Sequence, residues 1–196
     1  KDGTDNSRAL ALNWRYVVIG WSLCFGCNFG MRPICTFIPK FLAEQGRPAW
    51  LAGAMLFLLY IMLALVGSQV YRFRRWQYRR RPLLVQQGLI LLCFIGLWSF
   101  SNMVATAIIL MVAGLLYGFS YFWSVYYVSN HPRSSRNVGV NEALVGVANI
   151  LGVLASQAVI TYFHNESTYY LLVASVLAFL LLAQWIWLRP RNFSTL

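Results

Sequence analysis

The residues of this sequence best spaced for chemistry lie in the stretch CFGCNFGMRPICTFIPK, residues 24–40. Asn28, Arg32 and Thr36 recur every fourth residue, so in a helix they lie on one face. A guanidinium beside an amide and a hydroxyl can bind a carboxylate or another anion. The two prolines of the stretch free backbone carbonyls, which Arg32 could satisfy instead. The sequence leaves both roles open for Arg32: contact with an anion in a cavity, and a structural contact with the backbone.

The cysteines of the sequence do not form a metal-binding pattern. A zinc site needs four ligands at defined spacing, and the CxxC of this stretch supplies two. The two histidines, His131 and His164, lie far away at predicted helix ends. Cysteines inside apolar runs are most often small buried side chains; here they are Cys24, Cys27, Cys35 and Cys93. We expect no metal, no cofactor and no disulfide framework.

Two further apolar segments carry polar residues at helical spacing. Tyr117 and Tyr121 are four residues apart within a segment of about 103–129, and Asn149 lies within a segment of about 138–163. Side chains three or four residues apart share a helix face. The residues predicted to face a common substrate cavity are Asn28, Arg32, Thr36, Tyr117, Tyr121 and Asn149.

The segment of about 138–163 has two other features. Glu142 falls in its predicted first turn, where the helix dipole favours a carboxylate. We therefore expect Glu142 to cap this helix, with a nearby arginine as its partner. Small residues let membrane helices approach closely, which is the expected role of Gly139, Gly146 and Gly152.

The elements that position these residues follow from the composition. The chain has 196 residues, of which 59% are hydrophobic and 11% are charged. A soluble domain has about 25% charged residues, so polar side chains here are too few to cover a globule. The sequence predicts an integral membrane protein. The formal net charge is +11, but the basic residues flank apolar runs, as in membrane-protein loops, so we expect no nucleic-acid partner.

Six apolar runs are long enough to cross a bilayer, which takes about 20 residues. The predicted fold is therefore an all-α membrane protein with six transmembrane helices. The predicted spans are about 14–42, 49–71, 83–100, 103–129, 138–163 and 168–188. Residues 1–13 are expected to form a cytoplasmic linker and residues 189–196 a cytoplasmic tail.

The basic residues predict the orientation of these spans. With the N-terminus inside, 13 of the 16 Lys and Arg residues fall in inside segments, and Lys40 and Arg47 fall outside. Arg32 is left within a span. Cytoplasmic loops are enriched in Lys and Arg, so both termini are predicted to be cytoplasmic.

The spans fall into two sets of three with similar roles. The first of each set (14–42 and 103–129) carries a polar stripe, whereas the third (83–100 and 168–188) is almost wholly apolar. Consecutive sets of three spans insert with opposite orientation. The pattern therefore predicts two inverted three-helix repeats, which are typical of secondary transporters.

Three stretches of the sequence point to one family. They are IPKFLAEQGRPAWLAG, GSQVYRFRR and GLLYGFSYFWSVYYVSNHPRSSRNVGVNEALVGVANILG. Together they resemble the major facilitator superfamily of secondary transporters over about residues 14–188. The second stretch is similar to the family's loop motif G-x-x-x-D-R-x-G-R-R/K, and the matching positions are Gly67, Arg72 and Arg75. The motif's Asp and second Gly are replaced by Tyr71 and Arg74.

The resemblance implies transport of a small molecule by alternating access, and Arg32 favours an anionic solute. Family members have twelve helices in two halves, so we expect this chain, which begins with Lys1 rather than Met, to be one half. The polar lead-in KDGTDNSRALALNW and the absence of Gly-Pro from ILGVLASQ favour the C-terminal half. The expected partners are the lipid bilayer of a cell or inner membrane, the missing N-terminal half and the solute.

Two alternatives to a transporter remain. Gly118-Phe119-Ser120 is similar to the G-x-S of rhomboid proteases, which also have six helices. Their general base is a histidine on the sixth helix, where this sequence has none, and a nucleophile needs a base within hydrogen-bond reach. We therefore do not expect an enzyme. A non-transporting receptor or scaffold of the same fold is the other alternative.

Overall fold

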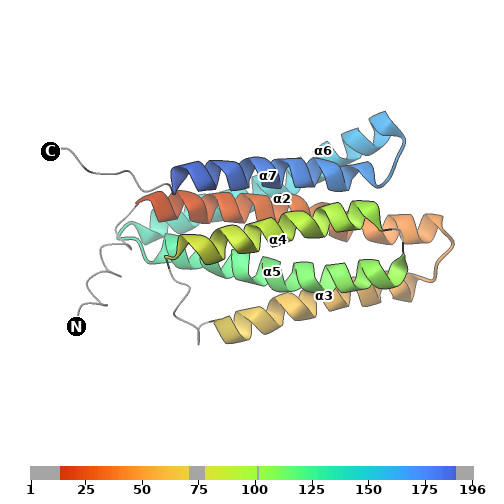
Figure 1. Ribbon diagram of the computed structural model, residues 1–196, viewed down its shortest axis with the longest axis horizontal. Coiled ribbons are helices and arrows are strands. Elements are labelled where there is room, and N and C mark those ends of the chain that lie inside the picture. Colours follow the sequence, from red (N-terminus) through yellow and green to blue (C-terminus); the bar gives the residue numbers. More distant parts are fainter. Residues whose placement is uncertain (1–13, 71–77, 101, 189–196) are drawn as a thin grey trace.

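The computed structural model describes residues 14–70, 78–100 and 102–188 of the chain. Within these ranges the chain forms an elongated bundle of six helices that run along a common axis (Figure 1). The helices are α2 (Trp14–Glu44), α3 (Ala49–Gln69), α4 (Arg80–Ser99), α5 (Met103–Ser129), α6 (Ser134–Phe163) and α7 (Thr168–Trp187). The all-helical fold is thus confirmed. The predicted linker and tail lie outside the described residues.

The helix bounds agree with the predicted spans to within about one turn, or 3.6 residues, at most ends. The largest difference is at α6, which begins at Ser134 rather than near residue 138. Glu142 therefore lies beyond the second turn of α6, where its side chain is exposed. The first turn of α6 holds no acidic residue. The capping role predicted for Glu142 is wrong, because the polar residues before it already belong to the helix.

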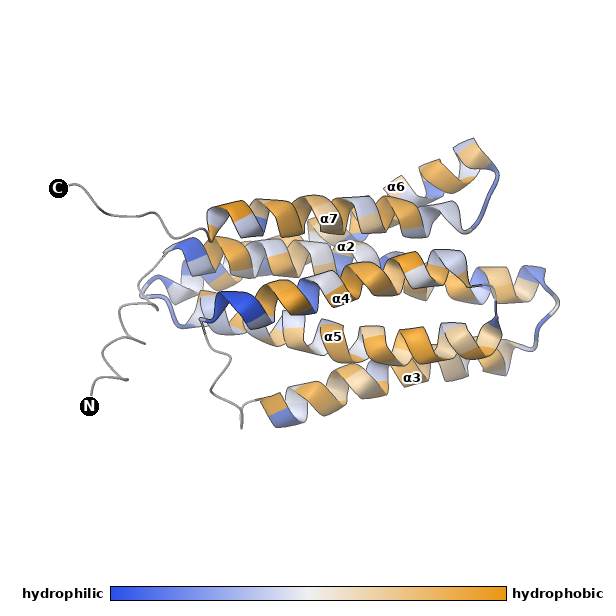
Figure 2. Cartoon of the chain, viewed as in Figure 1, coloured by the Kyte–Doolittle hydropathy of each residue, from blue (hydrophilic) through white to orange (hydrophobic). Residues whose placement is uncertain are grey.

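Five of the helices, α3 to α7, are long and apolar enough to cross a membrane. Hydrophobic residues run along the middle of the bundle, and hydrophilic residues gather at its two ends (Figure 2). These five helices indicate an integral membrane protein. α2 has 31 residues and so is long enough to span, but polar side chains in its middle lower its hydropathy.

α2 and α5 form the centre of the bundle. The most extensive helix packing joins α3 to α5, α2 to α6, α2 to α5 and α4 to α7. α2 buries 16 of its 31 residues and packs against α3, α5, α6 and α7. Its remaining open face lies between α3 and α6, where the polar residues at positions 28, 32 and 36 are found.

Glycines set two of the closest helix contacts. A Cβ atom at Gly114 of α5 would meet the backbone oxygen of Leu59 in α3, and one at Gly152 of α6 would lie 2.5 Å from the backbone oxygen of Phe29. Gly152 thus has its predicted role. Gly139 and Gly146 contact no other helix among the described residues, since no atom lies within 4 Å of their Cβ positions. Both are exposed on α6.

Buried polar side chains join neighbouring helices. Gln86 of α4 donates to Ser120 Oγ at 2.7 Å and to the backbone oxygen of Leu116 at 2.6 Å, both in α5. Ser124 of α5 donates to Asn141 Oδ1 of α6 at 2.9 Å. Hydrogen bonds of this kind hold helices in register inside a membrane.

Candidate functional site

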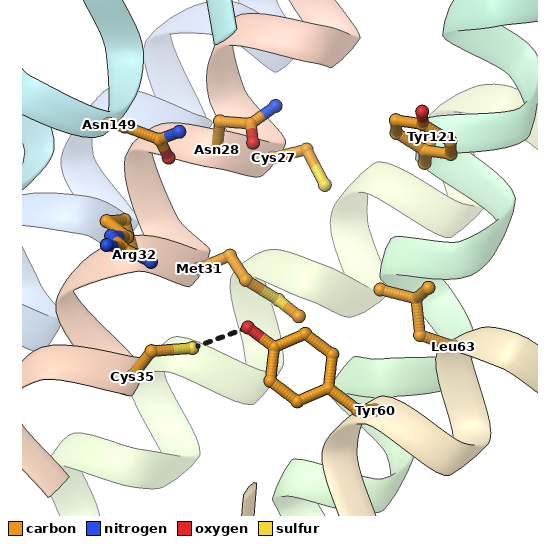
Figure 3. A pocket seen from close by; sticks show the side chains of 9 residues that line it. All are labelled: Cys27, Asn28, Met31, Arg32, Cys35, Tyr60, Leu63, Tyr121 and Asn149. Atoms are coloured by element: carbon orange, nitrogen blue, oxygen red, sulfur yellow. Dashed lines mark hydrogen bonds between the residues drawn. The ribbon is translucent and has the colours of Figure 1, made fainter. Parts of the chain in front are cut away.

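A pocket of about 240 Å³ opens on the face of α2 that its neighbours leave uncovered. It draws residues from four helices: five from α2, two from α3, and one each from α5 and α6. The lining residues, all drawn in Figure 3, are Cys27, Asn28, Met31, Arg32, Cys35, Tyr60, Leu63, Tyr121 and Asn149. Polar side chains from the middle of these four helices therefore line a single pocket.

Asn28, Arg32 and Asn149 lie together on one side of the pocket (Figure 3). The amide of Asn28 donates to the backbone oxygen of Cys24 at 2.8 Å, which fixes its orientation. Within the described ranges, the Arg32 guanidinium makes no hydrogen bond or ion pair and is exposed. The structural alternative, in which Arg32 satisfies carbonyls freed by the two prolines, is therefore not what the side chain does.

Tyr60, Leu63 and Tyr121 form the opposite side of the pocket (Figure 3). Tyr60 Oη lies 3.1 Å from Cys35 Sγ, a hydrogen bond that joins α3 to α2. Tyr60 and Tyr121 are 46% and 48% exposed, so about half of each residue is uncovered. This side combines aromatic and aliphatic surface with two hydroxyls.

Arg32 lies near the middle of α2, well before the C-terminal end of the helix. It is eight residues before Lys40, which corresponds to about 12 Å at the helical rise of 1.5 Å per residue. Lys40 pairs with Glu44 at 3.8 Å near the end of the helix. The pocket therefore lies near the middle of the length of α2, away from the charged helix end.

The structure brings four of the six predicted cavity residues into this pocket: Asn28, Arg32, Tyr121 and Asn149. Thr36 lies on the same exposed face of α2, and its hydroxyl donates to the backbone oxygen of Arg32 at 3.0 Å, but it does not line the pocket.

The prediction for Tyr117 is wrong. Its side chain is fully buried and packs against Gly30 of α2 and Phe94 of α4. Residues four apart on a helix are offset by about 40°, since one turn takes 3.6 residues. That offset separates Tyr121, at the pocket, from Tyr117, in the core. The slot beside Gly30 then admits the buried ring.

Sequence reasoning missed Tyr60 and Cys35. Tyr60 is the only hydroxyl-bearing side chain between Ala49 and Gly67, and a lone polar group in an otherwise apolar span was the available signal. Cys35 gave none, because a cysteine inside an apolar run is most often buried. In the structure its thiol is free and partly exposed.

The predicted loop motif is described only in part. Gly67 is exposed near the end of α3, with open space around its Cβ position, whereas Arg72 and Arg75 lie outside the described residues. No three His, Cys, Asp or Glu side chains in the described ranges are grouped so that they could hold a metal ion. Comparison of the chain with protein-family models, with curated proteins and with solved structures finds no match.

Proposed function

We propose that this chain is the C-terminal six-helix half of a secondary transporter of the major facilitator superfamily, which moves a small solute by alternating access. The observation that carries the proposal is the pocket around Arg32, set among apolar helices. An arginine at the centre of a membrane helix costs about 2.5–3.5 kcal/mol on insertion scales and in membrane proteins faces a wet cavity or a partner. A solute path provides that environment.

The packing of the helices supports two inverted repeats. In two such repeats α2 corresponds to α5, α3 to α6 and α4 to α7. Under this correspondence, the contact between α3 and α5 in the bundle matches the contact between α6 and α2. The same correspondence maps the α2–α5 and α4–α7 contacts onto themselves. These four are the most extensive contacts of the bundle, as a pseudo-two-fold axis between two three-helix repeats requires.

The face around the pocket supports a second six-helix half as partner. Gly53, Tyr60 and Gly67 of α3 are seven residues apart, so they lie on one face, and Tyr60 places that face at the pocket. On α6, Gly139 and Gly146 have open space around them. Exposed glycines destabilise a helix by about 0.5–1 kcal/mol relative to Ala, and close approach of another helix is a reason to keep them.

The described basic residues support cytoplasmic termini. Six arginines lie at the end of the bundle where α2 and α4 begin and α5 connects to α6, whereas Lys40 and Arg47 lie at the other. The six are Arg15, Arg79, Arg80, Arg81, Arg133 and Arg136. Cytoplasmic loops carry such an excess. This asymmetry supports an orientation with the first end inside the cell and the Lys40–Glu44 end outside.

The function is tested by solute uptake into liposomes that contain the full-length protein. Candidate solutes are screened first, and Arg32→Ala is then compared with Arg47→Ala, which removes an arginine from the α2–α3 connection outside the pocket. We expect Arg32→Ala to abolish uptake without loss of expression and Arg47→Ala to retain it. Uptake that persists in Arg32→Ala while only folding suffers would refute the solute-contact role. Binding without uptake would instead identify a receptor of the same fold.

The buried position of Ser120 weighs against the protease alternative. Its side chain is 1% exposed, and its oxygen accepts hydrogen bonds from the amides of Gln86 and Gln87. Among the residues that the structure describes, no histidine forms a hydrogen bond with Ser120. A serine held in this way has neither an approach for substrate nor a base.

A further inference from the structure

The pocket carries a single formal charge. Arg32 is the one charged residue among the nine that line it. Of the described acidic residues, Glu44 is paired with Lys40, and Glu166 lies beside the same pair at the helix end. Glu142 is seven residues before Asn149 on α6, which is about 10 Å along the helix. A ligand in the pocket therefore meets a net charge of about +1.

The single positive charge of Arg32 determines which anions the pocket should bind best. A ligand that fills the pocket displaces water from it, and a charge shielded from water is stable only when it is paired and hydrogen-bonded. A monoanion neutralises Arg32, whereas a dianion leaves one negative charge without a partner. A guanidinium binds a carboxylate through two parallel N–H···O bonds, so a carboxylate suits this arginine best.

Asn149 provides a second donor for the same group. It lies beside Arg32 at the pocket wall (Figure 3), and its amide makes no hydrogen bond with any residue that the structure describes. A carboxylate oxygen placed between Arg32 and Asn149 would satisfy both side chains. Asn28 is less available as a donor, because its amide already binds the backbone oxygen of Cys24.

The wall of the pocket opposite Arg32 and Asn149 favours a ligand with an apolar body. Met31, Leu63 and the half-exposed residues Tyr60 and Tyr121 form this surface. Aromatic rings favour offset or edge-to-face contact with another ring. The volume of about 240 Å³ is smaller than a typical pocket for a drug-sized ligand, which is about 300–1,000 Å³.

We propose that the pocket binds small monocarboxylates with an aromatic or branched apolar body, with the carboxylate on Arg32 and Asn149 and the body against Tyr60, Leu63 and Tyr121. This inference rests on the proposed function in taking the pocket as the solute site. It adds the charge, the binding group and the shape of the solute.

Protection of Cys35 from a small methanethiosulfonate reagent tests the inference without measuring transport. Cys35 lines the pocket, so an occupant should slow its modification. The full-length protein in liposomes is treated with millimolar benzoate, with benzamide as its neutral isostere, or with phthalate as the dianion. The rate in Cys35→Ser gives the background to subtract.

We expect benzoate to protect Cys35, and benzamide and phthalate to protect it at least about tenfold less well, since hydrogen bonds to a charged group contribute about 1.5–3 kcal/mol. Arg32→Gln should weaken protection by benzoate by about 10- to 100-fold, and Arg47→Gln should leave it unchanged. Equal protection by benzamide, full protection in Arg32→Gln, or no protection by benzoate would each overturn the inference. Protection without uptake of benzoate would leave the inference standing and count against transport.

Discussion

Tyr117 of α5 lies against Gly30 of α2, in a slot that a Cβ atom at residue 30 would close. The phenol is fully buried, and its ring meets Phe94 of α4 edge-on with 6.4 Å between the ring centroids. The missing side chain at Gly30 therefore allows α5 to anchor a large aromatic residue against both α2 and α4. This contact joins α5 to α2, and both of these helices contribute residues to the pocket.

Gly30→Ala should lower the free energy of unfolding by about 1–3 kcal/mol, the usual effect of overpacking a dense core. The added Cβ would overlap Tyr117 Oη and lie 3.0 Å from the ring of Phe94. Thermal unfolding in detergent measures the change. Gly88→Ala in α4 is the matched control, because no atom lies within 4 Å of the Cβ position of that glycine, and it should be neutral or slightly stabilising. The double variant Gly30→Ala/Tyr117→Phe should recover part of the loss, and a failure to recover any would place the strain elsewhere.

Ser120→Ala should cost about 0.6 kcal/mol, the average for a hydrogen bond between membrane helices, and leave uptake intact. The substitution removes the acceptor that Gln86 of α4 uses at 2.7 Å. A double-mutant cycle with Gln86→Leu measures the coupling. Ser175→Ala, which removes an exposed hydroxyl bonded only within its own helix, is the control. Complete loss of uptake in a folded Ser120→Ala protein would contradict this purely structural role and show that the serine takes part in chemistry.

Stability should increase as the pH falls through the acidic range. Glu166, in the connection between α6 and α7, has its pKa raised above the ordinary value, chiefly by desolvation and also by hydrogen bonding and repulsion with Glu44, while Lys40 opposes the shift. The folded protein then holds this proton more tightly than the unfolded chain does. The resulting stability is present below the ordinary pKa and is lost as the pH rises through the raised one.

Thermal unfolding of Glu166→Gln across that range tests the assignment. The variant should lose this part of the pH dependence, because its side chain cannot titrate. Glu142→Gln, which changes an exposed acid on α6, should keep it. An unchanged pH profile in Glu166→Gln would show that another group is responsible.

The sequence was sufficient to predict the helices and part of the pocket. The long apolar runs fixed the number and approximate ends of the helices, and the four-residue spacing of Asn28 and Arg32 placed both on the open face of α2. Spacing gives the face of a helix but not what covers it. For that reason Tyr117 was assigned to the cavity and Gly146 to a packed contact, although the first is buried and the second exposed.

We propose that the pocket lies on a solute path that opens to each side of the membrane in turn. Modification of Cys35 in sealed vesicles of known orientation tests it most directly. A membrane-impermeant methanethiosulfonate reagent is added to one side or the other of vesicles that contain the full-length protein, and Cys35→Ser gives the background rate. Cys35 should be modified from either side, at rates that a transported solute changes. Modification from one side alone, with and without solute, would contradict alternating access.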